Sequence, residues 1–197
     1  MTTKPPKNGL HTIYHKNDQK SEEGKYKDGK KEGKWTSWDS KGEITAEGKY
    51  KAEKKHGKWI NKSLHSVEEG KYINDIKEGK WIYWLLGRII SEKYYSNGDS
   101  VREIRFYHDG QKEHEVNKED GNFFSWHKNG QKSSEGFLND KGHFSNKGRE
   151  AQWTYWYENS QLHSQGCYKD GIEDGKWTYW YDDGQKKSEG CYKDRRR

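Results

Sequence analysis

Aliphatic side chains and phenylalanine are scarce in this chain, since Leu, Ile, Val and Phe together supply only 24 of its 197 residues. Such a composition, with 36% charged residues, is typical of disordered chains. Ten tryptophans and fourteen tyrosines argue against disorder, because they recur at regular spacing and each can bury a large area. The sequence therefore predicts a folded chain with an aromatic core.

Long apolar runs are also missing. None could span a membrane, and the start MTTKPPKNG lacks the apolar stretch of a secretory signal, so we expect a soluble, cytoplasmic protein. Only two cysteines occur, Cys167 and Cys191, at equivalent positions of adjacent repeats. Equivalent positions two strands apart are separated by roughly 9.6 Å, which is too far for an unstrained disulfide, so we expect two reduced thiols.

The motifs of common enzyme and metal sites are not evident. No Ser/His/Asp order, Walker loop or paired-carboxylate arrangement stands out, and no Cys/His cluster has zinc spacing. The carboxylates recur with the repeat, whereas a catalytic residue would be expected to break it. We therefore expect no enzyme activity, no cofactor, no metal and no small-molecule substrate.

What the chain has in abundance is one repeated phrase. EGKYKDGKKEGKW runs over 23–35, and close versions run over 47–59, 69–81 and 165–177. The step from Gly70 to Gly136 is three times the step before it, so it holds two degenerate repeats with equivalent positions at Glu92 and His114. About eight repeats follow, which predicts one supersecondary unit stacked many times. The glycines of the phrase are Gly24, Gly48, Gly70, Gly136, Gly166 and Gly190.

Two turn signals occur in each repeat, and they predict hairpins. Asp-Gly and Asn-Gly pairs supply the positive φ of tight turns, and they leave two strands of about five to seven residues per repeat. No helical periodicity is present. We predict an all-β fold, an elongated single-layer antiparallel β-hairpin ladder of about eight repeats.

The repeat sets the expected domain organisation. Residues 1–10 form an N-terminal tail, and residues 11–197 form a single repeat domain that is degenerate near 85–122. Trp153 follows Gly136 at a longer interval than the tryptophans of the other repeats follow their glycines, which places an insertion in a hairpin tip near 141–149. The last repeat is incomplete, and a natural cap, a truncation or a part of a longer protein would each explain it.

The spacing between the repeat glycine and its tryptophan is otherwise constant, and it predicts the hairpin register. With a turn centred on Gly29-Lys30, Gly24 lies opposite Trp35 and Tyr26 lies opposite Gly33. Each large ring then covers a residue without a side chain, so a thin sheet buries its aromatics without a second layer. The pairs with equal spacing are Gly24/Trp35, Gly48/Trp59, Gly70/Trp81 and Gly166/Trp177.

The resemblance to a known family is carried by these residues. GKYKDGKKEGKW at 24–35 closely resembles the MORN repeat, and WTYWYDDGQKKSEGCYKD from Trp177 is similar to its bacterial variant, the YwqK-type antitoxin family. The resemblance is strong in the first three and last three repeats and weak over 85–122. It implies a hairpin ladder that acts as a protein-interaction or scaffold module. Some members are linked to membrane lipids, and some sit beside toxins.

The candidate binding site is a lysine stripe on the sheet face opposite the aromatic core. In the predicted register Lys25 pairs with Lys34, and the next two repeats pair their lysines likewise, although like charges opposite one another are unfavourable. The alternative is that glutamates on the same face, such as Glu23, neutralise the stripe. The predicted site comprises Lys25, Lys34, Lys49, Lys58, Lys71, Lys80, Trp38 and Trp84.

Several partner classes suit this surface. The leading hypothesis is a non-enzymatic module that binds another protein, and a toxin is one such partner by resemblance. A basic, aromatic-studded stripe also suits anionic lipid or nucleic acid. A choline- or glucan-binding array is a further alternative, since such arrays share the abundance of Trp, Tyr and Gly. Open sheet edges also allow self-association.

Overall fold

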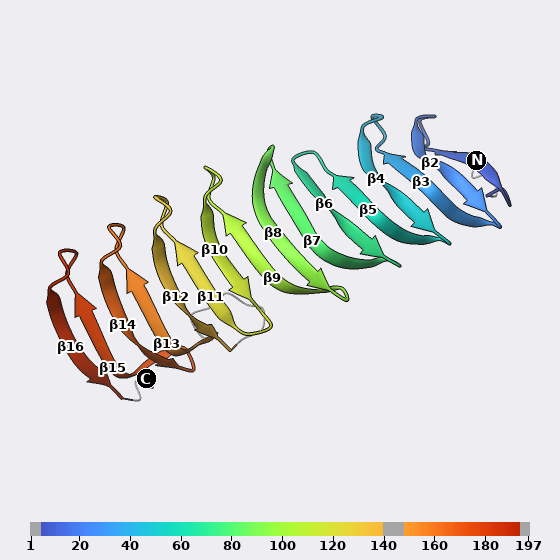
Figure 1. Cartoon of the computed structure of the whole chain (residues 1–197). Helices are drawn as coiled ribbons and strands as arrows, with labels where there is room; N and C mark the ends of the chain where they lie inside the picture. Colours follow the sequence, from blue (N-terminus) through green and yellow to red (C-terminus); the bar gives the residue numbers. More distant parts are fainter. Residues whose placement is uncertain (1–4, 140–147, 194–197) are drawn as a thin grey trace. The chain divides into compact units, whose positions relative to one another are not determined.

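The computed structural model describes residues 5–139 and 148–193 of the chain. The chain divides into two compact units, Met1–Ser100 and Val101–Arg197. Each unit consists of one layer of antiparallel strands that pair with their neighbours in chain order (Figure 1). The structure therefore confirms the predicted all-β, single-layer hairpin ladder.

The first unit begins with β1, which starts inside the segment predicted to form a tail. Short turns join each strand to the next, and the described residues of this unit contain no helix long and apolar enough to cross a membrane. Its strands are β1 (Gly9–Tyr14), β2 (Lys20–Lys27), β3 (Lys30–Trp38), β4 (Ile44–Lys51), β5 (Lys54–Lys62), β6 (Ser66–Ile73), β7 (Ile76–Leu85) and β8 (Arg88–Ser96).

The second unit continues the pattern through the stretch that the sequence marks as degenerate. The predicted hairpin-tip insertion near 141–149 lies largely outside the described residues. The strands are β9 (Asp99–Phe106), β10 (Lys112–Asn117), β11 (Asn122–Trp126), β12 (Lys132–Leu138), β13 (Arg149–Trp156), β14 (Leu162–Lys169), β15 (Ile172–Trp180) and β16 (Lys186–Tyr192).

The hairpin register confirms one predicted pair and corrects the others. Gly24 lies opposite Trp35 as predicted, but Tyr26 lies opposite Lys31 instead of Gly33. The turn is centred on Asp28-Gly29, whose φ angles of 50° and 75° suit a two-residue hairpin turn. The chain then bulges from β3 at Gly33-Lys34. The earlier turn and the bulge offset each other, so the spacing from glycine to tryptophan is kept although the pairs near the turn differ.

The aromatic core lies on one face of each sheet, over the repeat glycines. A Cβ atom added at Gly70 would lie 2.2 Å from Cδ2 of Trp81, and that indole is completely buried. Tyr72 packs edge-on against the same indole, with ring centroids 4.9 Å apart. The prediction of an aromatic core of rings over glycines is confirmed. Similar close approaches occur at Gly24, Gly48, Gly136 and Gly166.

The two degenerate repeats replace the glycine by a larger residue. The position opposite Trp81 holds Lys93, and the position opposite Phe123 holds Val116, so the predicted equivalents Glu92 and His114 are each slightly displaced along the chain. Phe123 is smaller than tryptophan and fits above the branched Val116 side chain. The two cysteines are free and exposed, as expected.

Candidate functional site

The predicted site residues lie on one face of the first unit, which we call the lysine face. Strand alternation places Lys34 and Trp38 on the side of β3 away from the buried Trp35. The contacts of Trp38 agree with this placement. The Lys20 ammonium lies 5.8 Å from the Trp38 ring and 2.7 Å from the carboxylate of Glu23, a residue predicted to share the face of the lysines. The predicted residues of this face are Lys25, Lys34, Lys49, Lys58, Lys71, Lys80, Trp38 and Trp84.

The predicted pairing of lysines inside each hairpin is wrong. Because the turn is centred on Asp28-Gly29, Lys25 lies opposite Glu32 rather than Lys34. Lysines face one another between hairpins instead. Lys34 lies opposite Lys49 of the next hairpin. The next lysine pair, between β5 and β6, is Lys58 with Lys71.

Carboxylates compensate only one member of each lysine pair. Lys34 and Lys58 each bind a glutamate, although their side chains remain 71% and 68% exposed. Lys49 and Lys71 make no ion pair with any residue that the structure describes, and the same holds for Lys25. The alternative that glutamates neutralise the lysines therefore holds for only half of the six lysines of this face. The ion pairs are Lys34–Glu47 (3.1 Å), Lys58–Glu69 (2.9 Å) and Lys80–Glu92 (2.6 Å).

His56 leaves the middle of the lysine face short of negative charge. It lies opposite Lys49, where the neighbouring hairpins hold Glu32 and Glu78. Its Nδ1 atom is buried and has no hydrogen-bond partner among the described residues. The substitution removes the carboxylate that would stand beside Lys49, so positive charge is concentrated there.

Net charge is divided unequally between the two units. Residues 1–100 contain 21 Lys and Arg against 15 Asp and Glu, whereas residues 101–197 contain 17 of each. The whole formal net charge of +6 therefore belongs to the first unit. A field of this kind attracts acidic partners and loses its reach as salt rises.

Two neighbouring turns of the first unit carry exposed apolar side chains, which the sequence analysis missed. The turns touch, because the Leu86 amide donates a hydrogen bond to the His65 carbonyl at 2.8 Å. Leu64 is 80% exposed and Leu86 71% exposed. Other turns at the same place in the repeat are polar, such as KNDQ at 16–19, so LLGRI at 85–89 was a signal available in the sequence. This apolar turn pair consists of Leu64, Leu85, Leu86, Ile89 and Ile90.

The opposite, aromatic face holds its own cations, and these belong to the core. The Lys31 ammonium lies 4.2 Å from the centroid of Trp35 and 2.6 Å from the Glu22 carboxylate. Lys55 lies 4.4 Å from the Trp59 ring, but Ala46 stands where Glu22 stands in the hairpin before. Burial lowers the pKa of Lys55. Cation–π contacts therefore stabilise the packed rings, and this face is not a second lysine stripe.

Among residues 5–139 and 148–193, no group of three or more His, Cys, Asp or Glu side chains is arranged to hold a metal ion. The candidate site consists of the lysine face and the apolar turn pair at its border.

Comparison with known families agrees with the repeat architecture. Residues 31–52, 149–170 and 173–194 match the family model described as MORN repeat variant. The first match spans β3, the following turn and β4, which pair with one another. No curated protein matches the chain. The three matches cover about a third of the chain and support its similarity to the MORN-repeat family, whose members are generally non-catalytic repeat modules that bind proteins or membranes.

Proposed function

We propose that this protein is a non-enzymatic interaction module that binds an acidic protein on the lysine face of its first unit. One observation carries the proposal: lysines lie opposite lysines between hairpins, and one member of each pair has no ion-pair partner among the described residues. Like charges in cross-strand contact destabilise a sheet. A partner carboxylate placed between Lys34 and Lys49 would relieve that cost, and water relieves it only in part.

The apolar turn pair supports a protein as the partner. Exposed apolar residues that cluster at one place often mark a protein interface, whereas single exposed residues need no explanation. Leu64 and Leu86 can enter a pocket on a partner while the lysines contact acidic groups around it. A toxin neutralised by this module is the narrower form of the proposal, and the resemblance to the antitoxin-type variant supports it.

The test is capture of partners from the native host, with three forms of the full chain as bait. Reversal of Lys25, Lys49 and Lys71 to Glu should weaken binding of the captured protein on the order of 100-fold, since each lost contact contributes about 0.5–1 kcal/mol and each reversal adds repulsion. The matched control reverses Lys16 and Lys41, together with Lys128 of the second unit, all exposed in turns. This control changes the net charge equally and should retain most of the binding.

The outcome that contradicts the proposal is equal loss of binding in both triple variants, because net charge alone would then explain it. Unchanged binding in both variants would also remove the lysine face as the site. Circular dichroism of each variant shows whether the sheet survives.

A second candidate is an anionic membrane surface, which the exposed leucines favour because they lie in turns of the positively charged first unit. Sedimentation with vesicles of phosphatidylcholine alone and with phosphatidylserine separates the two ideas. Binding to the acidic vesicles that is lost in Leu64→Ser/Leu86→Ser supports the membrane. No binding even at low salt excludes it.

A further inference from the structure

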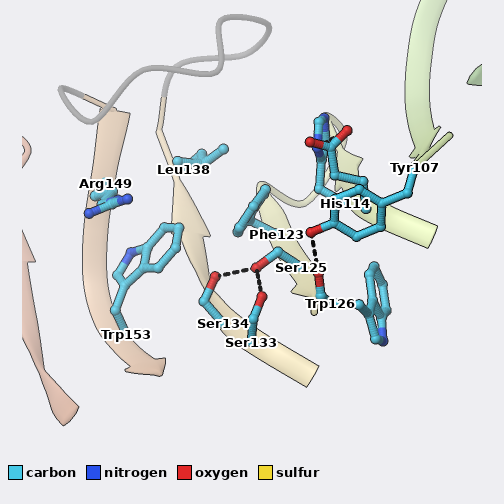
Figure 2. Close-up of a pocket in the computed structure, with 11 residues that line it drawn as sticks. Tyr107, His114, Phe123, Ser125, Trp126, Ser133, Ser134, Leu138, Arg149 and Trp153 are labelled. Atoms are coloured by element: carbon cyan, nitrogen blue, oxygen red, sulfur yellow. Dashed lines mark hydrogen bonds and ion pairs between the residues drawn. The ribbon is translucent and has the colours of Figure 1, made fainter. Parts of the chain in front are cut away.

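A hollow of about 260 Å³ opens on the aromatic face of the second unit, between β10, β11, β12 and β13 (Figure 2). It is independent of the lysine face, which belongs to the first unit. Its walls combine rings with hydroxyl groups. The lining residues that matter here are Phe123, Ser125, Ser133, Ser134, Leu138 and Trp153.

The hollow exists because this repeat has smaller side chains at three aromatic positions. Phe123 stands where the next two hairpins carry a buried tryptophan, Trp153 and Trp177. Ser125 stands where the next hairpin carries Tyr155, the second residue after its tryptophan. Leu138 replaces the tyrosine of the following strand, as seen by comparing GFL at 136–138 with GCY at 166–168.

The replaced tyrosines make a recurring contact elsewhere in the ladder. The hydroxyl groups of Tyr155 and Tyr168 lie 3.4 Å apart, and those of Tyr179 and Tyr192 lie 3.1 Å apart. In the repeat with the hollow, Ser125 and Leu138 hold these two places. The missing volume is therefore that of phenol rings. A cavity of about 150 Å³ holds a benzene molecule, so this hollow has room for one ring with its substituent.

Three serine hydroxyl groups in the hollow suit a hydroxyl group of a ligand, and the charged side chains of Glu113 and Arg149 also line the hollow. The Oγ atom of Ser125 lies 2.6 Å from Oγ of Ser133 and 2.7 Å from Oγ of Ser134 (Figure 2). Hydroxyl groups can rotate to donate or accept, so this cluster can take up one more hydroxyl group. Burial lowers the pKa of His114, which also lines the hollow, and so favours the uncharged form of its ring.

The rings of the wall are already fixed in place. Phe123 and Trp153 are stacked with centroids 5.3 Å apart, and both side chains are almost fully buried. The indole Nε1 of Trp153 donates to the Phe137 carbonyl at 3.2 Å, which holds the ring orientation. A preformed aromatic wall lowers the entropic cost of binding a further ring.

We propose that this hollow receives the phenolic ring of a tyrosine side chain from another polypeptide, which completes the aromatic ladder where the chain's own tyrosines are absent. The ring would contact Phe123 and Trp153, and its hydroxyl group would join the serine cluster. The hollow is then a specificity pocket, which binds one tyrosine side chain of the partner.

The test uses N-acetyl-tyrosinamide as the probe and the full chain with its ten tryptophans as the reporter. In the indole region of a ¹H–¹⁵N spectrum, the Trp153 resonance should shift saturably at about 1–10 mM probe, as expected for a ligand of this size. Resonances of Trp35, Trp59 and Trp81 should not move. N-acetyl-phenylalaninamide, which lacks the hydroxyl group, should bind several-fold more weakly.

The variant Ser125→Tyr restores the side chain that the next repeats use and should fill the hollow. It should weaken probe binding at least tenfold and raise the melting temperature. Ser37→Tyr, at the same repeat position of the first unit, is the matched control and should leave binding unchanged. Equal binding to wild type and Ser125→Tyr overturns the proposal. A wild-type titration without any saturable shift of Trp153 overturns it as well, whether or not the variant folds.

Discussion

Replacement of Gly70 by alanine tests the aromatic core most severely. The added methyl carbon would lie 2.2 Å from the fully buried Trp81 indole, whereas ordinary contact begins at 3.4 Å. Backbone strain is not involved, because φ of Gly70 is not in the left-handed region. The ring must move, and overpacking of this kind costs about 1–3 kcal/mol, with an upper limit of about 3–5 kcal/mol if the burial of the tryptophan is lost.

The last repeat offers a matched control for this substitution. Gly190 occupies the same position of the phrase, but a Cβ atom there would meet nothing within 4 Å. Gly190→Ala should therefore be neutral or slightly stabilising, by up to about 1 kcal/mol. Urea unfolding followed by tryptophan fluorescence and circular dichroism measures both variants. If Gly70→Ala is destabilised no more than Gly190→Ala, the reasoning that rings over glycines hold the sheet together is refuted.

Two further predictions concern the charges and hydroxyl groups of the aromatic face. Ala46→Glu should give Lys55 a carboxylate partner like the one that Glu22 provides for Lys31, and it should raise the free energy of unfolding by about 0.5–1 kcal/mol. Ala46→Gln is the uncharged control. If Ala46→Glu is no more stable than Ala46→Gln, the prediction is wrong. Burial raises the pKa of Tyr50 and of Tyr95 to about 12, whereas unfolded tyrosine titrates near pH 10, so both phenols bind their protons more tightly in the folded state. Their contribution to stability is complete below about pH 10 and is lost as pH rises from 10 to 12. Alkaline absorbance titration of the folded protein should accordingly show these phenols ionising late, and ionisation of every tyrosine near pH 10 without unfolding contradicts the prediction.

The fold was predictable because its main determinant is local and repeated. The constant spacing between glycine and tryptophan appears in the sequence, and the close approach of the Trp81 indole to Gly70 explains why the spacing is constant. The pairing nearer to the turn was not predictable, because a tight Asp28-Gly29 turn and a bulge at Gly33 offset each other along the chain. Side-chain alternation between Trp35 and Lys34 does not depend on that bulge. The predicted placement of these lysines on the side away from the rings therefore agrees with the structure, although their predicted pairs do not.

Other features depend on residues that meet only in the folded chain. The hollow requires Phe123, Ser125 and Leu138 to face one another from two strands, so none of these residues predicts the hollow by itself. How far the positive charge of the lysine face is neutralised depends on which glutamates form ion pairs with which lysines, and these pairs form only in the folded chain. His56 in the place of a glutamate was visible in the sequence, but its effect needed the register opposite Lys49.

The exchange of backbone amide protons with the captured protein bound tests the central claim most directly, because it reports where on the chain a partner lies. The account predicts that the partner slows exchange in β2 to β7 of the first unit, strongest around Lys49 and Lys71 and at the turns of Leu64 and Leu86, and that raising salt removes this protection. Protection confined to β11–β16 of the second unit, with the first unit unchanged, would contradict it.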